Sequence, residues 1–150
     1  MKFKILLAAL TITLFASCIT NDKADLNSNK MDSAAIRSLS DSTNFTTIQW
    51  IDSIKNFDKI TEGQKLEVVY HFKNTGTKPL IIASVTPGCG CTVADKPAEP
   101  IMPGKEGEIK AAFDSQGKTG QQHKNITVNA NTRPTQSFIL QFMVEVEKKS

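Results

Sequence analysis

Residues 138–146 read Phe-Ile-Leu-Gln-Phe-Met-Val-Glu-Val, with a large apolar side chain at every second position. A period of two is that of a β-strand that buries one face against a core. Further segments carry the same alternation or a similar apolar run, and we expect strands over 46–51, 66–73, 80–85, 108–114 and 125–130.

Turn-forming residues separate these segments. Residues 74–77, Asn-Thr-Gly-Thr, include residues that tolerate positive φ, and Pro103-Gly104 suits the centre of a type II turn. No convincing amphipathic helix is present beyond the leader. About seven short strands joined by such turns predict an all-β fold, an immunoglobulin-like antiparallel β-sandwich over residues 45–150. Its expected core includes Phe72, Phe113, Phe138 and Phe142.

The amino end has the order of an export signal that ends at a lipidated cysteine. Lys2 and Lys4 precede an apolar run over 5–15, and the small residues 16–17 precede Cys18. A membrane-spanning helix needs about 20 apolar residues, so this run is too short to be one. We expect residues 1–17 to be a lipoprotein signal peptide and Cys18 to anchor the mature chain to a membrane. The alternative is an ordinary secretory signal, with Cys18 removed or left free.

Residues 18–44 differ in composition from the rest. They are rich in Ser, Asn, Asp and Lys and contain few large apolar residues, so they cannot bury enough surface to offset the entropy of ordering. We expect a lipidated start followed by a disordered linker, with a short helical turn over 31–39 that is not stable alone. Without Lys2 and Lys4 the mature chain loses most of its formal charge of +3, and no basic face for nucleic acid remains.

Cys89-Gly90-Cys91 is the one local motif with chemical promise. An exported chain with Cys18 lipidated keeps these two thiols in an oxidising compartment. Flanking glycines allow a turn tight enough for a disulfide, and a structural disulfide or two packed thiols would pin this loop. A redox pair is the alternative, because strained exposed disulfides are easily reduced. No basic residue lies within four positions to lower a thiol pKa, so we favour the structural interpretation.

Metal and hydrolytic chemistry have little support in the sequence. Soft sulfur ligands would suit Cu(I) or Zn, but the candidate partners do not form a known ligand spacing. No serine elbow, phosphate loop or carboxylate pair beside a histidine is present. We therefore predict no metal, no cofactor and no catalytic residue, and we expect the two histidines to be solvated on the surface. The candidate partners considered are His71, His123, Met102 and Met143.

An ordered series of short motifs resembles the bacterial domain-of-unknown-function 1573 family. The resemblance covers 46–146 and implies an immunoglobulin-like domain similar to those of the Hydin and abnormal-spindle group. Such domains are common in Bacteroidetes envelope lipoproteins, and the family has no established activity. The motifs are Asn74-Thr75-Gly76, Pro79-Leu80-Ile81, Cys89-Gly90-Cys91-Thr92, Ile101-Met102-Pro103-Gly104, Gly107-Glu108-Ile109 and Phe113-Asp114, followed by Gly120, Lys124, Ile126 and Val128.

The same resemblance informs location and modification. Surface-exposed Bacteroidetes lipoproteins carry acidic residues after the lipidated cysteine, and residues 19–23 are mixed. We therefore expect a periplasm-facing chain at the outer membrane of a bacterial envelope. Asp-Ser-Ala at 32–34 and Asp-Ser-Thr at 41–43 are similar to O-glycosylation acceptor sites of that group, which makes Ser33 and Ser42 candidates.

Two classes of function remain open from the sequence. The first is a non-enzymatic module that binds or scaffolds a protein partner in the periplasm. The second is a thiol-based redox or metal-handling lipoprotein that uses Cys89 and Cys91.

Replacing Cys18 by Ala should release the protein from the membrane or leave it misprocessed, because the lipid would have no attachment site. Detergent phase partitioning and intact-mass measurement of the native chain check this. Unchanged membrane retention of Cys18→Ala, with an unchanged mass at the amino end, would contradict the lipoprotein prediction.

Overall fold

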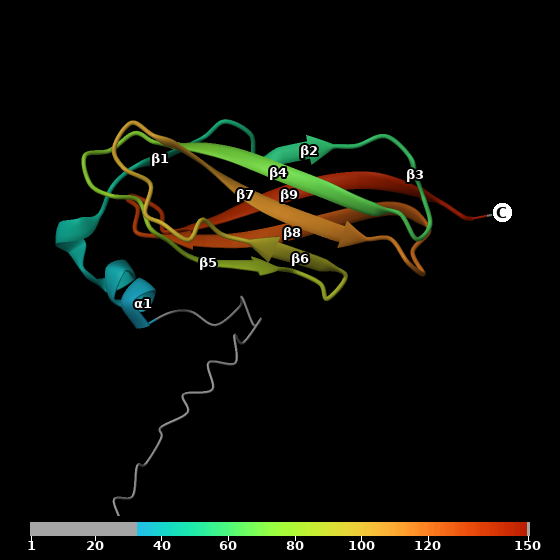
Figure 1. Ribbon diagram of the computed structural model, residues 1–150, viewed down its shortest axis with the longest axis horizontal. Helices are drawn as coiled ribbons and strands as arrows, with labels where there is room; N and C mark the ends of the chain where they lie inside the picture. The colour runs from blue at the N-terminus through green and yellow to red at the C-terminus, as the bar shows by residue number, and fades with distance from the viewer. Residues whose placement is uncertain (1–32, 150) are drawn as a thin grey trace, which may run out of the picture.

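The structure is a computed structural model, and it describes residues 33–149 of the chain. Two β-sheets pack face to face into a sandwich (Figure 1). The first sheet has the strand order β1-β4-β7-β6, and the second has the order β2-β9-β8-β5 with β3 also paired to β9. The strands are β1 (Ile48–Trp50), β2 (Ile54–Asn56), β3 (Ile60–Thr61), β4 (Lys65–Asn74), β5 (Ile82–Pro87), β6 (Thr92–Asp95), β7 (Glu106–Asp114), β8 (Gly120–Ala130) and β9 (Ser137–Glu147).

The immunoglobulin-like sandwich predicted from the sequence is confirmed, with one difference in strand direction. β2 and β3 run parallel to β9, so the second sheet is mixed, whereas every pairing in the first sheet is antiparallel. The parallel pairing arises because the chain crosses from one sheet to the other between Trp50 and Ile54 without reversing direction. Strand β5 begins two residues later than expected, at Ile82.

The apolar positions of the long strands meet between the sheets. Phe72, Phe113 and Phe142 are fully buried, and the Phe113 and Phe142 rings from opposite sheets lie 5.8 Å apart, edge to face. Phe138 is only partly buried, and its ring packs 5.8 Å from that of Trp50. Three of the four phenylalanines expected in the core are therefore buried in it, whereas Phe138 lies at its margin.

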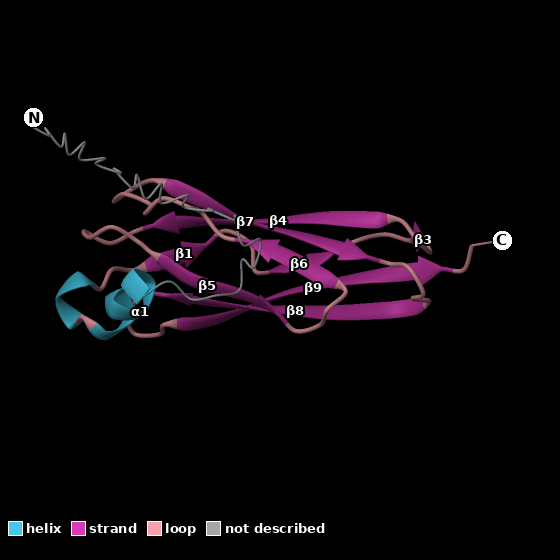
Figure 2. Ribbon diagram, turned by 60° about the horizontal axis from the view of Figure 1, so that its bottom comes forward, coloured by secondary structure: helices cyan, strands magenta, loops and turns pink. Residues whose placement is uncertain are grey.

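The last part of the expected disordered linker is ordered in the structure. Helix α1 (Ser33–Ser40) is followed by a 3-10 turn, η1 (Ser42–Asn44), and α1 packs beside β5 (Figure 2). Gln136 Nε2 donates to the Leu39 carbonyl oxygen at 2.9 Å. Such contacts stabilise a helix that is too short to form alone. The composition of the segment could not predict these contacts. Cys18 and the rest of the linker lie outside the described residues.

A buried asparagine holds the loops at the end of the sandwich where α1 lies. The Asn74 side chain is fully buried and satisfies both of its polar atoms. Its Oδ1 accepts hydrogen bonds from Thr46 Oγ1 at 2.8 Å and from the Gly76 N–H at 3.1 Å. Its Nδ2 donates to the carbonyl oxygens of Lys78 and Ile101, both at 2.8 Å. One side chain thus joins three loop segments.

The Asn131 side chain joins loop segments in the same way at the end of the second sheet. Its Oδ1 accepts from the Ile81 N–H at 2.7 Å, and its Nδ2 donates to the carbonyl oxygens of Asn44 at 2.7 Å and Pro79 at 3.0 Å. Its own carbonyl oxygen accepts from the Thr46 N–H at 3.0 Å. The two asparagines therefore fix the same end of the sandwich from both sheets.

The turn residues act in two different ways. Pro103-Gly104 forms the expected turn, since Gly104 has a φ of +76° and the Lys105 N–H donates to the Met102 carbonyl oxygen at 3.0 Å. None of residues 74–77 has a positive φ, since the described residues that have one are Gly63, Gly104, Gly117 and Gly120, so this turn does not use the tolerance noted in the sequence. Gly76 is required for space instead, since a Cβ there would overlap Thr46 Oγ1.

Replacing Asn74 by Ala should lower the free energy of unfolding by about 3 kcal/mol or more, because buried polar groups on several loops lose their partners. Urea unfolding measures the change. The matched control is Asn125→Ala on the exposed face of β8, which should change stability by less than about 0.5 kcal/mol. Equal effects of the two variants would show that Asn74 has no special role.

Candidate binding surface

The two outward faces of the sandwich differ in charge. The first sheet presents what we call the charged face, where acidic and basic side chains on β4 and β7 surround the outward residues Val69, Ala112 and Val93. Cross-strand neighbours of opposite charge include Lys65 with Asp114 and Lys73 with Glu106. Lys110 Nζ lies 2.8 Å from Glu108 Oε1, and this hydrogen bond lowers the pKa of Glu108. Both side chains of this pair stay exposed to solvent.

The second sheet presents what we call the amide face. The burial alternation of its strands points a second set of side chains outward, and these are mostly amides, hydroxyls and apolar groups. Glu145 and His123 are the titratable groups among them, and Glu147 at the far end of β9 is paired with Lys59 at 2.8 Å. The outward residues are Ile54 and Asn56 on β2, Ser137, Ile139, Gln141, Met143 and Glu145 on β9, Gln121, His123, Asn125, Thr127 and Asn129 on β8, and Ser84 and Thr86 on β5.

Hydrogen bonds between side chains order the amide face. Gln141 Nε2 donates to Asn125 Oδ1 at 3.2 Å, and Asn129 Nδ2 donates to Ser84 Oγ at 2.9 Å. Each bond joins neighbouring strands, so the amides are held in place but retain unused donors and acceptors.

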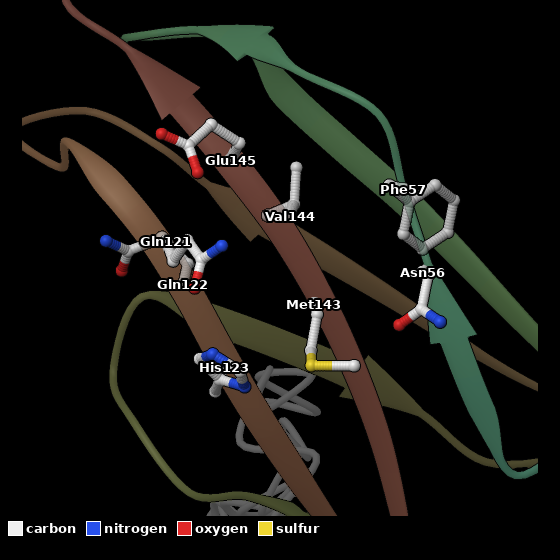
Figure 3. A pocket seen from close by; sticks show the side chains of 8 residues that line it. All are labelled: Asn56, Phe57, Gln121, Gln122, His123, Met143, Val144 and Glu145. Carbon is white, nitrogen blue, oxygen red and sulfur yellow. The ribbon is translucent and has the colours of Figure 1, made fainter.

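Exposed apolar side chains interrupt these amides. Ile54 is 59% exposed and Ile139 is 60% exposed. A hollow of about 230 Å³ opens between β2, β9 and β8, and Met143 lines it on β9, between Asn56 of β2 and His123 of β8 (Figure 3). A second hollow of similar size lies on the other side of Met143 and is lined in part by Ile54 and Gln141. The amide face therefore has exposed apolar side chains beside two shallow hollows.

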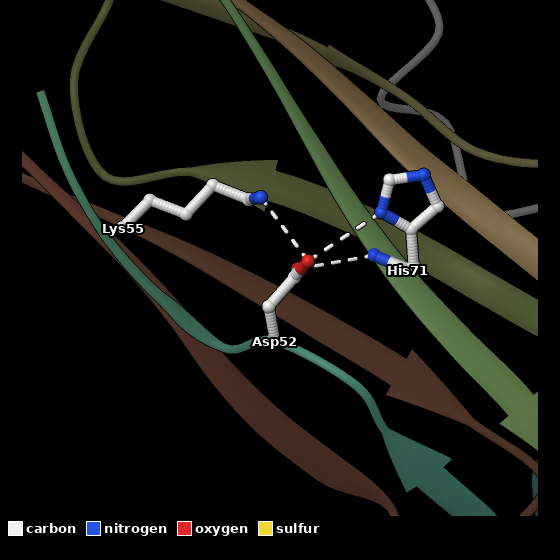
Figure 4. A network of polar contacts seen from close by, with 3 residues as sticks. All are labelled: Asp52, Lys55 and His71. Carbon is white, nitrogen blue, oxygen red and sulfur yellow. Dashed lines mark hydrogen bonds and ion pairs between the residues drawn. The ribbon is translucent and has the colours of Figure 1, made fainter.

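A polar network at the edge of β4 is structural. Asp52 Oδ1 accepts the His71 N–H at 3.1 Å, at the point where pairing with β1 ends, and Asp52 Oδ2 lies 3.1 Å from Lys55 Nζ and 3.4 Å from His71 Nδ1 (Figure 4). Burial raises the pKa of Asp52, but these hydrogen bonds outweigh it and the pKa is lowered overall. The Asp52 carboxylate thus accepts the backbone N–H of β4 that β1 no longer reaches. His71 is exposed, as expected from its place in the strand.

The Cys89–Cys91 loop connects β5 of the second sheet to β6 of the first. The two cysteines form a disulfide. The Gly88 N–H donates to the Asn125 carbonyl oxygen of β8, and the Asp114 N–H of β7 donates to the Cys91 carbonyl oxygen, both at 2.9 Å. The loop is therefore anchored on either side of the disulfide.

The fold brings one basic residue near this loop that sequence distance did not reveal. Lys124 precedes Asn125 on β8, and its Nζ lies 5.2 Å from the centre of the Phe113 ring. Burial, and then the nearby Lys118, lower the pKa of Lys124. Lys96, the nearest basic residue in sequence, instead donates to the Ala83 carbonyl oxygen at 3.2 Å. The closeness of Lys124 to this loop depends on strand pairing, so the sequence separation could not predict it.

The remaining candidate residues are dispersed. His123 and Met143 are neighbours across β8 and β9, and Met102 lies exposed in the Pro103-Gly104 turn. No three His, Cys, Asp or Glu side chains of residues 33–149 gather at metal-binding distance.

The two candidate glycosylation sites are exposed. Ser33 begins α1 and Ser42 begins η1, and their glycosylation stays a prediction. No helix of the described segment is long and apolar enough to cross a membrane.

The sandwich corresponds closely to one protein family. Residues 48–146 match the family described as "Protein of unknown function (DUF1573)", which is well over half of the chain. The chain belongs to the DUF1573 family. The family resemblance drawn from the sequence is thereby confirmed. Among curated proteins, none matches the chain.

Solved structures share the fold of this DUF1573 chain at low sequence identity. A Porphyromonas gingivalis protein of unknown function is 17% identical with a TM-score of 0.62, and the match covers 70% of this chain and 49% of that one. The present chain thus spans about half the length of that relative. The ASH/PapD-like domain 7 of human CEP192 is 11% identical with a TM-score of 0.53, over 71% of this chain and 89% of that domain. These similarities support the immunoglobulin-like, PapD-like fold.

Replacing Cys89 and Cys91 of this DUF1573 chain by Ser should lower the free energy of unfolding by less than about 3 kcal/mol, because the loop that the disulfide closes is very short. Circular dichroism should show an intact sandwich, and urea unfolding measures the loss. We also expect the purified wild-type chain not to reduce an oxidised test protein catalytically. Rapid catalytic reduction that disappears in the double Ser variant would contradict this and favour the redox alternative.

Proposed function

We propose that this DUF1573 chain is a non-enzymatic envelope lipoprotein whose domain binds or scaffolds a protein partner in the periplasm. In this proposal a lipid on Cys18 holds it at the outer membrane. The observation that carries the proposal is the amide face, a broad outward surface with hydrogen-bonding groups, exposed isoleucines and almost no charge.

The composition of the amide face favours contact with protein. Burying a charge carries a large desolvation penalty, and charged residues are depleted at the cores of protein interfaces, where methionine is enriched. Ile54, Ile139 and Met143 provide apolar area that gains from removal of water. The charged face has the opposite character and is suited to remain in water.

Helix α1 lies beside the edge strand β5 and leaves the rest of the amide face accessible. Helix α1 and the C-terminal end of β9 lie at opposite ends of the long axis (Figure 1). A tether that enters at α1 approaches the sandwich beside β5 at one end of the long axis, so the rest of the amide face stays free for a partner. The PapD-like fold hosts many functions and does not by itself choose among them.

A thiol-redox role for Cys89 and Cys91 is the second candidate. The disulfide between them and its place in an end loop favour it. The loop is anchored on both sheets and Lys96 is engaged elsewhere, which favours the structural role. The double Ser variant separates these two candidates.

A photo-crosslinking amino acid placed at Ile139 in the full-length chain, in its native membrane, should capture protein on the amide face. The matched control is Val93, which is 65% exposed on the charged side of the sandwich. We expect at least five-fold more crosslinked protein from position 139. Equal yields from both positions, or a higher yield from 93, would contradict the proposal.

A further inference from the structure

We propose that the end of the sandwich where α1 lies docks on anionic lipid headgroups, so that the long axis of the domain stands away from the membrane. We call this end the loop end, and it comprises α1 and residues 41–46, 74–79, 99–105 and 131–136. The inference rests on the proposed lipid at Cys18. It adds the surface that faces the membrane and the orientation of the amide face.

Basic side chains outnumber acidic ones at the loop end. Within residues 33–149 no carboxylate lies at ion-pair distance from any of these basic side chains. Thr43 and Asn44 donate hydrogen bonds to the Asp41 carboxylate, and Lys73 and Glu106 at the border of this end face each other across β4 and β7. The loop end therefore presents a net positive charge. Its exposed charged residues are Arg37, Lys78, Lys105 and Arg133 against Asp41 and Glu99.

The opposite end of the long axis has no such excess. Acidic and basic residues are equal in number there, and Lys59 Nζ is paired with Glu147 Oε1 at 2.8 Å. An anionic lipid surface attracts each Lys or Arg that lies near it, so the loop end is the one that such a surface favours. The charged residues of the opposite end are Asp58, Glu62, Asp114, Glu145 and Glu147 with Lys59, Lys65, Lys118, Lys148 and Lys149.

Hydrogen bonds of the main chain hold three of the basic residues in place. The carbonyl oxygens of Lys78 and Lys105 accept from Asn74, the first from its Nδ2 at 2.8 Å and the second from its backbone N–H at 2.9 Å. The Arg133 N–H donates to the Thr46 carbonyl oxygen at 3.1 Å. The loops that carry these charges are thus already ordered, so binding costs less conformational entropy than it would with mobile loops.

Arg133 lies beside a recess that is wide enough for a phosphate group. A hollow of about 680 Å³ is lined in part by Phe45, Arg133 and Pro134, and the Arg133 Cζ atom lies 4.5 Å from the centre of the Phe45 ring. A guanidinium group binds phosphate through paired hydrogen bonds. The loop end therefore offers a site for a lipid phosphate as well as a general attraction to the surface.

The length of the expected linker favours the loop end over the opposite end. Fourteen residues separate Cys18 from Ser33, and a flexible chain of that length spans on average about 20 Å. Strand β9 has 11 residues and is about 35 Å long. The linker joins the domain at α1, so a lipid at Cys18 holds the loop end near the headgroups and raises its effective concentration there. Weak contacts then suffice for docking.

This orientation keeps the amide face open to a protein partner. The C-terminal end of β9 lies at the far end of the long axis (Figure 1), so β8 and β9 run away from the membrane and their outward side chains face sideways. The loop end contacts the hydrated headgroup layer rather than the acyl chains, so small oxidants still reach Met102 in its exposed turn.

Contact quenching in vesicles tests the orientation. The full-length chain from its native membrane carries a bimane label at Thr77→Cys on the loop end or at Thr119→Cys on the opposite end, both exposed positions. Cys89 and Cys91 are joined in the disulfide and do not take the label. The vesicles are phosphatidylcholine with a nitroxide on the headgroup of a tracer lipid, with or without phosphatidylglycerol.

Phosphatidylglycerol should raise the quenching at position 77 at least three-fold and leave that at position 119 unchanged, because only the loop end is attracted to the anionic surface. Equal quenching at positions 77 and 119 would overturn the orientation. Stronger quenching at Ile139→Cys than at position 77 would overturn it as well, since the amide face would then lie on the membrane.

Charge reversal tests the contact itself. In the Thr77→Cys background, Lys105→Glu combined with Arg133→Glu should abolish the rise in quenching. The matched control, Lys148→Glu combined with Lys149→Glu, changes the net charge equally at the opposite end and should leave the rise intact. High salt should remove the rise in the otherwise unaltered chain, because exposed charges are screened. A rise that survives the loop-end substitutions would contradict the proposed contact.

Flotation of the same vesicles separates this inference from the proposed function. A chain that floats with neutral vesicles carries a membrane anchor, so an absence of quenching at position 77 in anionic vesicles would then overturn the inference alone. A chain that floats only with anionic vesicles and is quenched at position 77 would support the headgroup contact and contradict the lipid anchor. A chain that floats with neither kind of vesicle would contradict both.

Discussion

The alternation of apolar side chains in the four long strands is the constraint on which the rest of this structure depends. It commits one face of each sheet to the core, where Phe113 of the first sheet meets Phe142 of the second and Phe72 packs beside Trp50. The other face of each sheet must then be exposed, and its composition is free of packing demands. The difference between the charged face and the amide face is therefore a property that the fold permits but does not require.

Two edges of the sheets are partly covered by contacts within the chain. Helix α1 lies beside β5, and Lys96 donates to the Ala83 carbonyl oxygen on that strand. Asp52 takes the His71 N–H where β1 stops pairing with β4. Unpaired strand edges invite association with other strands, and each of these contacts removes part of that opportunity. This arrangement favours the proposed use of a face over association at these two edges.

The sequence predicted the long strands, the aromatic core and the family because a period of two over eight or more residues is a strong local signal. Strands β2, β3 and β6 were missed, since they are two to four residues long and are defined by the strand they pair with. The order of α1 was missed for the same reason, because its stability comes from β5 and Gln136. The candidate surface was visible only in part, because the outward residues of β9 follow from its alternation but their neighbours on β8 and β2 depend on register. The role of Asn74 was also hidden, because a buried asparagine and a turn asparagine look alike in sequence.

Methionine oxidation tests the central claim, that the amide face is covered in the envelope, most directly. Met143 lies on the amide face, and Met102 lies in an exposed turn and serves as an internal reference. The account predicts that Met143 oxidises at least three-fold more slowly in the native envelope than in dilute purified protein, while Met102 oxidises at the same rate in both. Equal rates for Met143 in the two preparations would contradict it.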